Sequence, residues 1–249
     1  MSWREELAVV VDALNPDKVF ILTDSGVAPL FRHDEETTIM VAAGEGSKSF
    51  GTLEKVLGEL VWRGATRRSL LVNIGGGMVS DLGGLAAGLF MRGIRHVNIP
   101  TTLLAMADAA IGGKTAIDFC GLKNQVGLFK MPERVITDSS WLSTLPWPLV
   151  RDGLAEVVKT AMLDGRECYE ACLELPDRPD AASLGPLALR AAAFKQEIVD
   201  RDPREQGLRR ILNLGHTAGH AFESLAARRG VTLSHGEAVA HGIAVALAL

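Results

Sequence analysis

The sequence lacks long apolar runs and clusters of basic residues, and these two absences exclude several classes of protein. A helix that spans a bilayer needs about 20 apolar residues, whereas the apolar run at 242–249 is far shorter. Arg4, Glu5 and Glu6 break the pattern of a signal peptide. With a net charge of −4 and no run of Lys or Arg, the chain offers no basic surface to nucleic acid or to an anionic membrane, and we expect neither as a partner.

Cysteine is scarce as well. The three cysteines, Cys120, Cys168 and Cys172, show neither the spacing of a zinc knuckle nor that of a disulfide framework. Reduced thiols are typical of the cytoplasm, and we therefore expect a cytoplasmic protein. Internal repeats and low-complexity segments are also absent from the sequence. Its 249 residues can form one large domain or two smaller ones with an ample core.

Predicted strands and helices alternate over about the first 140 residues. Apolar runs predict strands at Lys18–Thr23, Thr37–Ala43, Ser69–Ile74 and His96–Ile99. The segments between them predict helices at Glu5–Leu14, Gly51–Arg63 and Val79–Met91. Such alternation is typical of a parallel sheet, and after Trp141 the pattern becomes helical almost throughout. We predict an α/β fold: a Rossmann-like nucleotide-binding domain, residues 1–140, followed by an all-helical domain, residues 141–249.

A glycine-rich turn follows the third predicted strand. Gly75-Gly76-Gly77 leads directly into a helix, so bare backbone N–H groups and a helix N-terminus can face an anion such as a phosphate. Ser80 stands where the last glycine of a G-x-G-x-x-G motif would lie, so the standard dinucleotide fingerprint is absent. Asp81, in the first turn of that helix, is either stabilised by the helix dipole or in contact with a ribose or substrate. Tight turns also use glycine for steric reasons alone.

Two polar segments indicate a phosphorylated, polyhydroxylated ligand. Asp108 and Lys114 flank a Gly-Gly bend, and Lys123-Asn124 follows shortly after. Ammonium and amide groups in glycine-rich surroundings suit a phosphate and several hydroxyls. A solvated hairpin explains either segment taken alone.

Further on, Glu156 and Lys159 lie at i, i+3 on a predicted apolar helix, so they face the same way. Lys195 lies on another predicted helix, 187–199, which is rich in alanine. An ordinary surface ion pair also fits the spacing of Glu156 and Lys159, but their neighbours on the helix are apolar.

The segment Arg209–Phe222 carries the strongest signal of a metal site. On one continuous helix, Arg209, Asn213, His216 and His220 would form a single polar stripe. Such a stripe is costly to bury unless its groups have partners, and His235 adds a third imidazole at a Ser-His-Gly-Glu helix start. Core histidines with satisfied nitrogens are the alternative. Thr217 stands where an H-E-x-x-H metalloprotease would need its glutamate.

In this order the motifs resemble the 3-dehydroquinate synthase family of sugar phosphate cyclases over nearly the whole chain. The matching segments include GEGSKS (44–49), GGGMVSD (75–81), PTTLLAMADAAIGGKTAID (100–118), GLAEVVK (153–159), NLGHTAGHAFE (213–223) and HGEAV (235–239). The resemblance implies a dehydroquinate synthase-like fold in a homodimer. It implies a lyase of the shikimate pathway that converts 3-deoxy-D-arabino-heptulosonate 7-phosphate to 3-dehydroquinate with loss of phosphate.

The resemblance also implies roles for individual residues. A divalent metal, zinc or cobalt, would be held by Glu156, His216 and His235. NAD would be contacted by Asp24, Glu45, Lys48, Gly76, Gly77, Asp81, Thr101, Thr102, Lys123 and Thr144. The implied catalytic residues are Lys159, Lys195, Glu205 and His220. The implied substrate-binding residues are Asp108, Lys114, Asn124, Arg209, Asn213 and Arg92, the last of which would reach the phosphate bound by a neighbouring subunit.

The implied chemistry agrees with these residue types. Two histidines and one glutamate leave coordination positions open, as at catalytic zinc sites. Zinc eases deprotonation of a secondary alcohol, which favours hydride transfer to NAD. The resulting ketone acidifies the neighbouring C–H bond and permits elimination of phosphate. The reduced cofactor then returns its hydride, and ring opening and aldol closure complete the carbocycle.

Two features depart from the family pattern. Residues 145–149 read LPWPL where the family commonly reads LPPRE, so a charged pair beside the cofactor is missing. The chain stops at Leu249, whereas family members continue for several helices that include a phosphate-binding lysine. We therefore expect weak or absent activity from this chain alone. The alternatives are another sugar phosphate cyclase, such as a 2-deoxy-scyllo-inosose synthase, a metal-dependent polyol dehydrogenase, and a catalytically silent truncated homologue.

Overall fold

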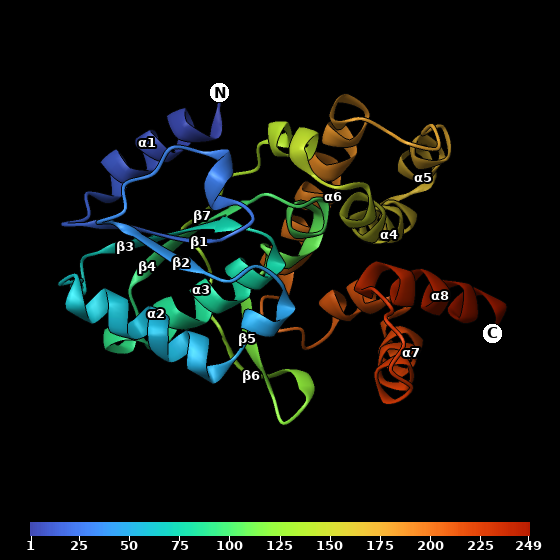
Figure 1. The fold of residues 1–249 in the computed structure, drawn as a ribbon. Helices are drawn as coiled ribbons and strands as arrows, with labels where there is room; N and C mark the ends of the chain where they lie inside the picture. Colours follow the sequence, from blue (N-terminus) through green and yellow to red (C-terminus); the bar gives the residue numbers. More distant parts are fainter. The chain divides into compact units, whose positions relative to one another are not determined.

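The computed structural model describes residues 1–249, apart from the side chain of Ala227. Contacts within the chain divide it into two compact units (Figure 1). The sheet unit comprises Met1–Thr101 and Gly113–Asp138, and the helical unit comprises Thr102–Gly112 and Ser139–Leu249. The predicted division at residue 140 stays a prediction, but the grouping of residues 102–112 with the helical unit did not emerge from the sequence.

A parallel sheet forms the centre of the sheet unit, as the alternating pattern predicts. Its strands follow the order β2-β1-β3-β4-β7. Their bounds are Val19–Asp24 for β1, Thr38–Val41 for β2, Leu70–Gly75 for β3, Arg95–Pro100 for β4 and Arg134–Val135 for β7. Every residue of the central strand β3 is buried, because parallel sheets are covered on both faces.

Three helices pack on this sheet within the part of the chain that the structure describes. They are α1 (Trp3–Leu14), α2 (Phe50–Trp62) and α3 (Gly77–Leu89), with α1 on one face and α2 and α3 on the other (Figure 1). The core contains apolar side chains of β1, β2, α2 and α3, among them Leu22, Ile39, Val56 and Leu82. The predicted helix Val79–Met91 in fact begins two residues earlier, because the glycine turn already has helical geometry at Gly77.

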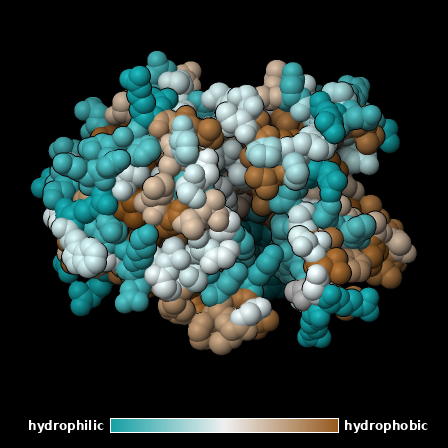
Figure 2. Space-filling view, in the orientation of Figure 1, coloured by the Kyte–Doolittle hydropathy of each residue, from teal (hydrophilic) through white to brown (hydrophobic). Residues whose placement is uncertain are grey.

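An antiparallel hairpin completes the sheet unit. Its strands are β5 (Lys114–Phe119) and β6 (Leu122–Phe129), and they join through Cys120 and Gly121, which both have positive φ. Positive φ at two successive residues is the geometry of a two-residue hairpin turn. Apolar side chains near the tip, including Phe119 and Leu122, are exposed, and the lower edge of the space-filling view shows this apolar patch (Figure 2).

The helical unit is built from five α-helices in the described residues. They are α4 (Trp147–Asp164), α5 (Arg166–Leu173), α6 (Ala181–Arg201), α7 (His216–Arg228) and α8 (His235–Ala248). Shorter elements are the π-helix η4 (Ala105–Ala109) and the 3₁₀ helices η5 (Ser139–Thr144) and η6 (Leu208–Asn213). Gly215 and Gly242 let α7 and α8 approach closely, because a Cβ at Gly242 would collide with the Gly215 carbonyl. No helix in the described part of the chain combines the length and apolar character that a membrane crossing requires.

The continuous helix predicted for Arg209–Phe222 is wrong. The 3₁₀ helix η6 ends at Asn213, and α7 begins only at His216. Between them Gly215 has a φ of 78°, a conformation that glycine adopts without steric cost and that interrupts an α-helix. The polar stripe is therefore broken, and the guanidinium of Arg209 bonds instead to the carbonyls of Pro203 and Gly112.

Candidate functional site

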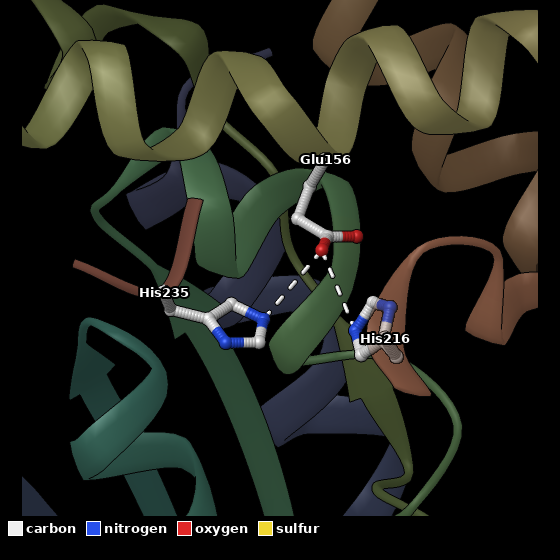
Figure 3. Close-up of side chains that lie close together, drawn as sticks. All are labelled: Glu156, His216 and His235. Atoms are coloured by element: carbon white, nitrogen blue, oxygen red, sulfur yellow. Dashed lines mark ion pairs between the residues drawn. The ribbon is translucent and has the colours of Figure 1, made fainter. Parts of the chain in front are cut away.

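Three side chains from three helices converge in the helical unit (Figure 3). Glu156 lies in the middle of α4, while His216 and His235 are the first residues of α7 and α8. Nε2 of each histidine lies 3.6 Å from Oε1 of Glu156. One ligand atom from each of the three residues lies within 4.8 Å of the other two.

This geometry fits a divalent cation. Ligands about 2.1 Å from a tetrahedral zinc are separated by about 3.4 Å, close to the two separations of 3.6 Å. The Glu156 side chain is fully buried, and neither of its oxygens accepts a hydrogen bond from the residues that the structure describes. Lys159, one turn later on α4, forms an ion pair with Oε2. Oε1 is thus a buried acceptor that faces two imidazoles.

The charges in the cluster favour the ionised carboxylate. Burial and the nearby Asp108 raise the pKa of Glu156, but His235, Lys159 and His216 outweigh them and hold it below its ordinary value. Burial alone would lower the pKa of His235, whereas Glu156 and Glu223 raise it to about 10. A cation at this position would replace the proton of that imidazole, since both provide positive charge beside Glu156.

Glu223 is a residue of this cluster to which the sequence analysis assigned no role. It lies on α7, and its Oε1 is 3.6 Å from Nδ1 of His235. A carboxylate beside the second nitrogen orients a metal-binding imidazole and fixes its tautomer. Its spacing of seven residues from His216, two helical turns, could have revealed it.

A second polar cluster surrounds Asp108, which lies on the π-helix η4. Nζ of Lys195 donates to Asp108 Oδ1 at 2.6 Å and to its backbone carbonyl at 2.8 Å. Nζ of Lys159 lies 3.9 Å from the same carboxylate. Single π-turns occur often at functional sites, and this one exposes a carbonyl and a carboxylate to the same ammonium.

Burial and neighbouring charges shift the pKa values of this cluster in opposite directions. Burial alone would raise the pKa of Asp108, but Lys195 and Lys159 lower it well below its ordinary value. Burial lowers the pKa of Lys195, and Asp108 offsets this only in part. For Lys159 the outcome differs, because Asp108 and Glu156 together outweigh burial and raise its pKa. Lys195 is therefore the ammonium of the pair that gives up its proton more readily.

The other catalytic and substrate-binding residues predicted in the helical unit make separate local contacts. Arg209 is buried and holds backbone carbonyls, whereas Asn213 is exposed and donates to Oε1 of Glu205 at 2.6 Å. Glu205 itself has a positive φ of 57°. The ring of His220 lies 5.5 Å from that of His216 and 6.4 Å from that of His235, measured between centroids, so it borders the metal cluster.

In the sheet unit, Gly76 is the N-cap of α3 and provides no side chain to the free N–H groups of the first turn. Beside this turn lies Lys48, which is buried and pairs with Asp81 at 2.6 Å and with Glu45 at 3.4 Å. Burial alone would lower the pKa of Lys48, but the two carboxylates outweigh it and raise it. The turn and the buried ammonium form an arrangement suited to an anionic cofactor.

The other predicted cofactor residues are distributed over both units. Asp24 accepts hydrogen bonds from Gly26 and Val27 in the turn after β1. The backbone N–H of Thr101 donates to Gly75, whereas Thr102 and Thr144 belong to the helical unit. Lys123 is exposed on β6.

The hairpin separates two of the predicted substrate residues. Lys114 pairs with Phe129 at the open end, whereas Asn124 lies near the tip, where its N–H donates to Asp118. About four residues of strand, roughly 13 Å, separate them. Arg92 is exposed and has a positive φ of 70° after Met91, which has a φ of 50°. Consecutive left-handed residues other than glycine are strained, and such strain often marks functional sites.

Comparisons with known proteins identify the family. Residues 38–152 match the 3-dehydroquinate synthase N-terminal family, and residues 153–249 match the 3-dehydroquinate synthase C-terminal family. A 3-dehydroquinate synthase of Parabacteroides distasonis is 42% identical over 249 residues, which cover 96% of this chain and 70% of that protein.

Two solved structures are also similar. One is 2-deoxy-scyllo-inosose synthase complexed with carbaglucose-6-phosphate, NAD+ and Co2+, with a TM-score of 0.81 and 28% identity over 96% of this chain and 68% of that one. The other is 2-epi-5-epi-valiolone synthase from Streptomyces hygroscopicus with NAD+ and Zn2+ bound, with a TM-score of 0.77 and 29% identity over 95% and 69% of the two chains. The chain belongs to the 3-dehydroquinate synthase family.

Proposed function

We propose that this protein is a 3-dehydroquinate synthase, a lyase that converts 3-deoxy-D-arabino-heptulosonate 7-phosphate to 3-dehydroquinate and releases phosphate. The observation that carries the proposal is the convergence of Glu156, His216 and His235 beside the ion pair of Asp108 and the buried Lys195. A structural zinc site would be closed by four protein ligands, whereas this set of three leaves room for a substrate oxygen.

Glu156, His216 and His235 would hold the divalent metal. When bound, the metal polarises a substrate alcohol and eases its deprotonation. Zinc is the proposed ion, because imidazole and carboxylate ligands suit it and the separations match its bond lengths. Lys159 remains beside the other carboxylate oxygen and keeps Glu156 ionised.

NAD would bind at the glycine turn of the sheet unit. Gly76 and Gly77 offer backbone N–H groups to its pyrophosphate, and Lys48 provides a buried positive charge. When bound, NAD accepts a hydride from the substrate and later returns it. The free helix start and the absence of a side chain at Gly76 support this placement.

The buried amine of Lys195 would transfer protons to and from the substrate. Because burial lowers its pKa, Nζ can release a proton more readily than an exposed lysine. The Asp108 carboxylate, 2.6 Å away, would hold that amine in position and stabilise its charged form. His220, whose ring lies beside those of His216 and His235, and Asn213 are both exposed and would contact substrate hydroxyls.

Other assignments complete the proposal. Arg209, Lys114, Asn124 and Arg92 would bind the carboxylate and phosphate of the substrate, with Arg92 serving a neighbouring subunit of a homodimer. We also propose that the protein acts in the shikimate pathway and that it is located in the cytoplasm. The three cysteines form no disulfide among the described residues, and free thiols are compatible with that location.

A direct assay tests the function. The protein is incubated with zinc, NAD and the heptulosonate phosphate, and phosphate release is followed alongside absorbance of the reduced nicotinamide. We expect phosphate release that needs both NAD and zinc, without net accumulation of NADH, and its loss in His216→Ala. Stoichiometric NADH formation would instead indicate a dehydrogenase. Binding of NAD and zinc without any phosphate release would contradict the proposal and indicate a catalytically silent homologue.

A further inference from the structure

Helix α4 contacts the start of α8 one turn before Glu156. Oδ1 of Asp152 accepts a hydrogen bond from the backbone N–H of Gly236 at 2.5 Å. Asp152 and Glu156 lie at i, i+4 and therefore share one face of α4. Gly236 directly follows His235. Helix α4 thus provides the candidate ligand Glu156 and also contacts Gly236, the neighbour of the candidate ligand His235.

The contact depends on close packing of the two helices. Gly236 is buried, and a Cβ at that position would overlap the backbone carbonyl of Asp152. A second contact lies beside the first, because the guanidinium of Arg151 pairs with the carboxylate of Glu237. The first turn of α8 is therefore fixed to α4 through both its backbone and a side chain.

The Asp152 contact adds to a cap that α8 already has within its own segment. Ser234 already accepts from the N–H of Glu237, and the Glu237 carboxylate accepts in return from the N–H of Ser234. This capping box satisfies the N–H groups of Ser234 and Glu237 and leaves that of Gly236 to Asp152. Asp152 lies 84 residues earlier in the chain and so connects two separate helices. The contact therefore fixes the position of the first turn of α8 relative to α4.

We propose that Asp152 is a positioning residue for the metal site. By accepting a hydrogen bond from the N–H of Gly236, it fixes the start of α8 so that Nε2 of His235 can bind the same metal ion as Glu156. The inference rests on the proposed function, in that it takes Glu156, His216 and His235 as metal ligands. Outer partners that fix a ligand in advance raise metal affinity, because less order remains to be imposed when the ion binds.

Three variants test the role. Asp152→Ala removes the acceptor, and Asp152→Asn keeps an oxygen at the same place. Asp180→Ala is a matched control, because Asp180 accepts from the N–H of Ser183 at 2.8 Å in the first turn of α6, away from the metal cluster. Zinc affinity is measured by competition with a chromophoric chelator, and the geometry of the site by the visible absorption of bound Co2+.

We expect Asp152→Ala to bind zinc roughly 10–100-fold more weakly and to change the Co2+ spectrum, as outer partners of metal ligands do. Asp152→Asn should retain most of the affinity, and Asp180→Ala should bind zinc as the parent does although both alanine variants lose a helix contact. Equal affinity in Asp152→Ala and Asp180→Ala would overturn the inference. A parent protein that binds no zinc would refute the metal assignment itself.

If Asp152→Ala does not fold, as judged by circular dichroism, Asp152→Glu replaces it. The longer side chain keeps a carboxylate but shifts it by one methylene, so the start of α8 can no longer be held in the same place. We expect the same direction of change in zinc affinity. Parent-like zinc binding by Asp152→Glu, with an unchanged Co2+ spectrum, would overturn the inference.

Discussion

Lys48 shows how a single buried charge can prepare a cofactor site. Its side chain is 4% exposed, and its ammonium lies 2.6 Å from Asp81 and 3.4 Å from Glu45. Because these carboxylates more than offset the effect of burial on its pKa, the group stays charged at neutral pH. A fixed positive charge that is already desolvated interacts strongly with an anionic ligand.

We therefore predict that Lys48→Met weakens NAD binding by roughly ten- to a hundredfold, because a hydrogen bond to a charged group contributes about 1.5–3 kcal/mol. Zinc affinity should not change. Isothermal calorimetry with NAD measures the effect, and Lys55→Met, on the exposed side of α2, provides the control. Parent-like NAD affinity in Lys48→Met would leave this lysine with only a structural role beside Asp81.

Among the strands, β4 contains an unusual core residue. His96 is 1% exposed, and neither ring nitrogen has a hydrogen-bond partner among the described residues. Burial, with a smaller contribution from the charge of Lys130, lowers the pKa of His96 from 6.5 to about 4. The neutral ring fits this apolar position, whereas an imidazolium does not.

The sheet unit should consequently lose stability in acid. Between pH 6.5 and 4 the unfolded chain binds a proton at His96 that the folded chain does not, so the free energy of unfolding falls as pH falls through that window. The lost contribution is at most about 3 kcal/mol. Urea unfolding of the parent and of His96→Asn at pH 7 and pH 5 measures it.

The variant should show a smaller difference between the two pH values, while His33→Gln, which alters an exposed histidine, should behave as the parent. If the pH dependence of His96→Asn matches that of the parent, His96 does not contribute to acid sensitivity.

The sequence predicted the regular elements better than their ends and interruptions. Alternating apolar runs predicted the parallel sheet, because strand periodicity and turn residues are local properties. The break at Gly215 was missed, since a glycine inside a helical pattern does not reveal its own φ. The π-helix at Asp108 was missed as well, because nothing in the local residue pattern marks an extra residue in one turn.

The candidate site shows the same division between local and distant information. The resemblance pointed to Glu156, His216 and His235, and the structure brings these three together. Asp152 could not be assigned from the sequence, because its importance lies in its contact with the backbone of Gly236 on α8. The spacing of Glu223 from His216 hints at a shared helix face, but its contact with His235 does not follow from that spacing. Contacts between segments far apart in the chain are set by tertiary packing, and a single sequence does not reveal them.

At the scale of the whole molecule, the predicted metal and cofactor sites belong to different units. The metal ligands lie in the helical unit, and the glycine turn with Lys48 lies in the sheet unit. A ligand that binds only the folded state stabilises it by about 2.7 kcal/mol at a concentration 100 times its Kd. For a chain of this size that corresponds to about 5–10 °C in Tm.

We expect zinc and NAD each to raise the Tm of the protein, and a chelator to reverse only the effect of zinc. Differential scanning calorimetry measures the shifts. His216→Ala should lose the response to zinc and keep the response to NAD. Loss of both responses in that variant would mean that it disrupts the fold as a whole, and retention of both would exclude His216 as a ligand.

The placement of residues 102–112 has a consequence for attempts to cut the protein into parts. The chain passes from one unit to the other after Thr101, after Gly112 and after Asp138. A fragment that began at residue 139 would lack Asp108 and the backbone of Leu104, against which Gly153 of α4 packs. The helical unit is one body in space but two pieces of the gene, so a chimaera or a transplanted domain must carry both pieces to keep Asp108 beside Lys195.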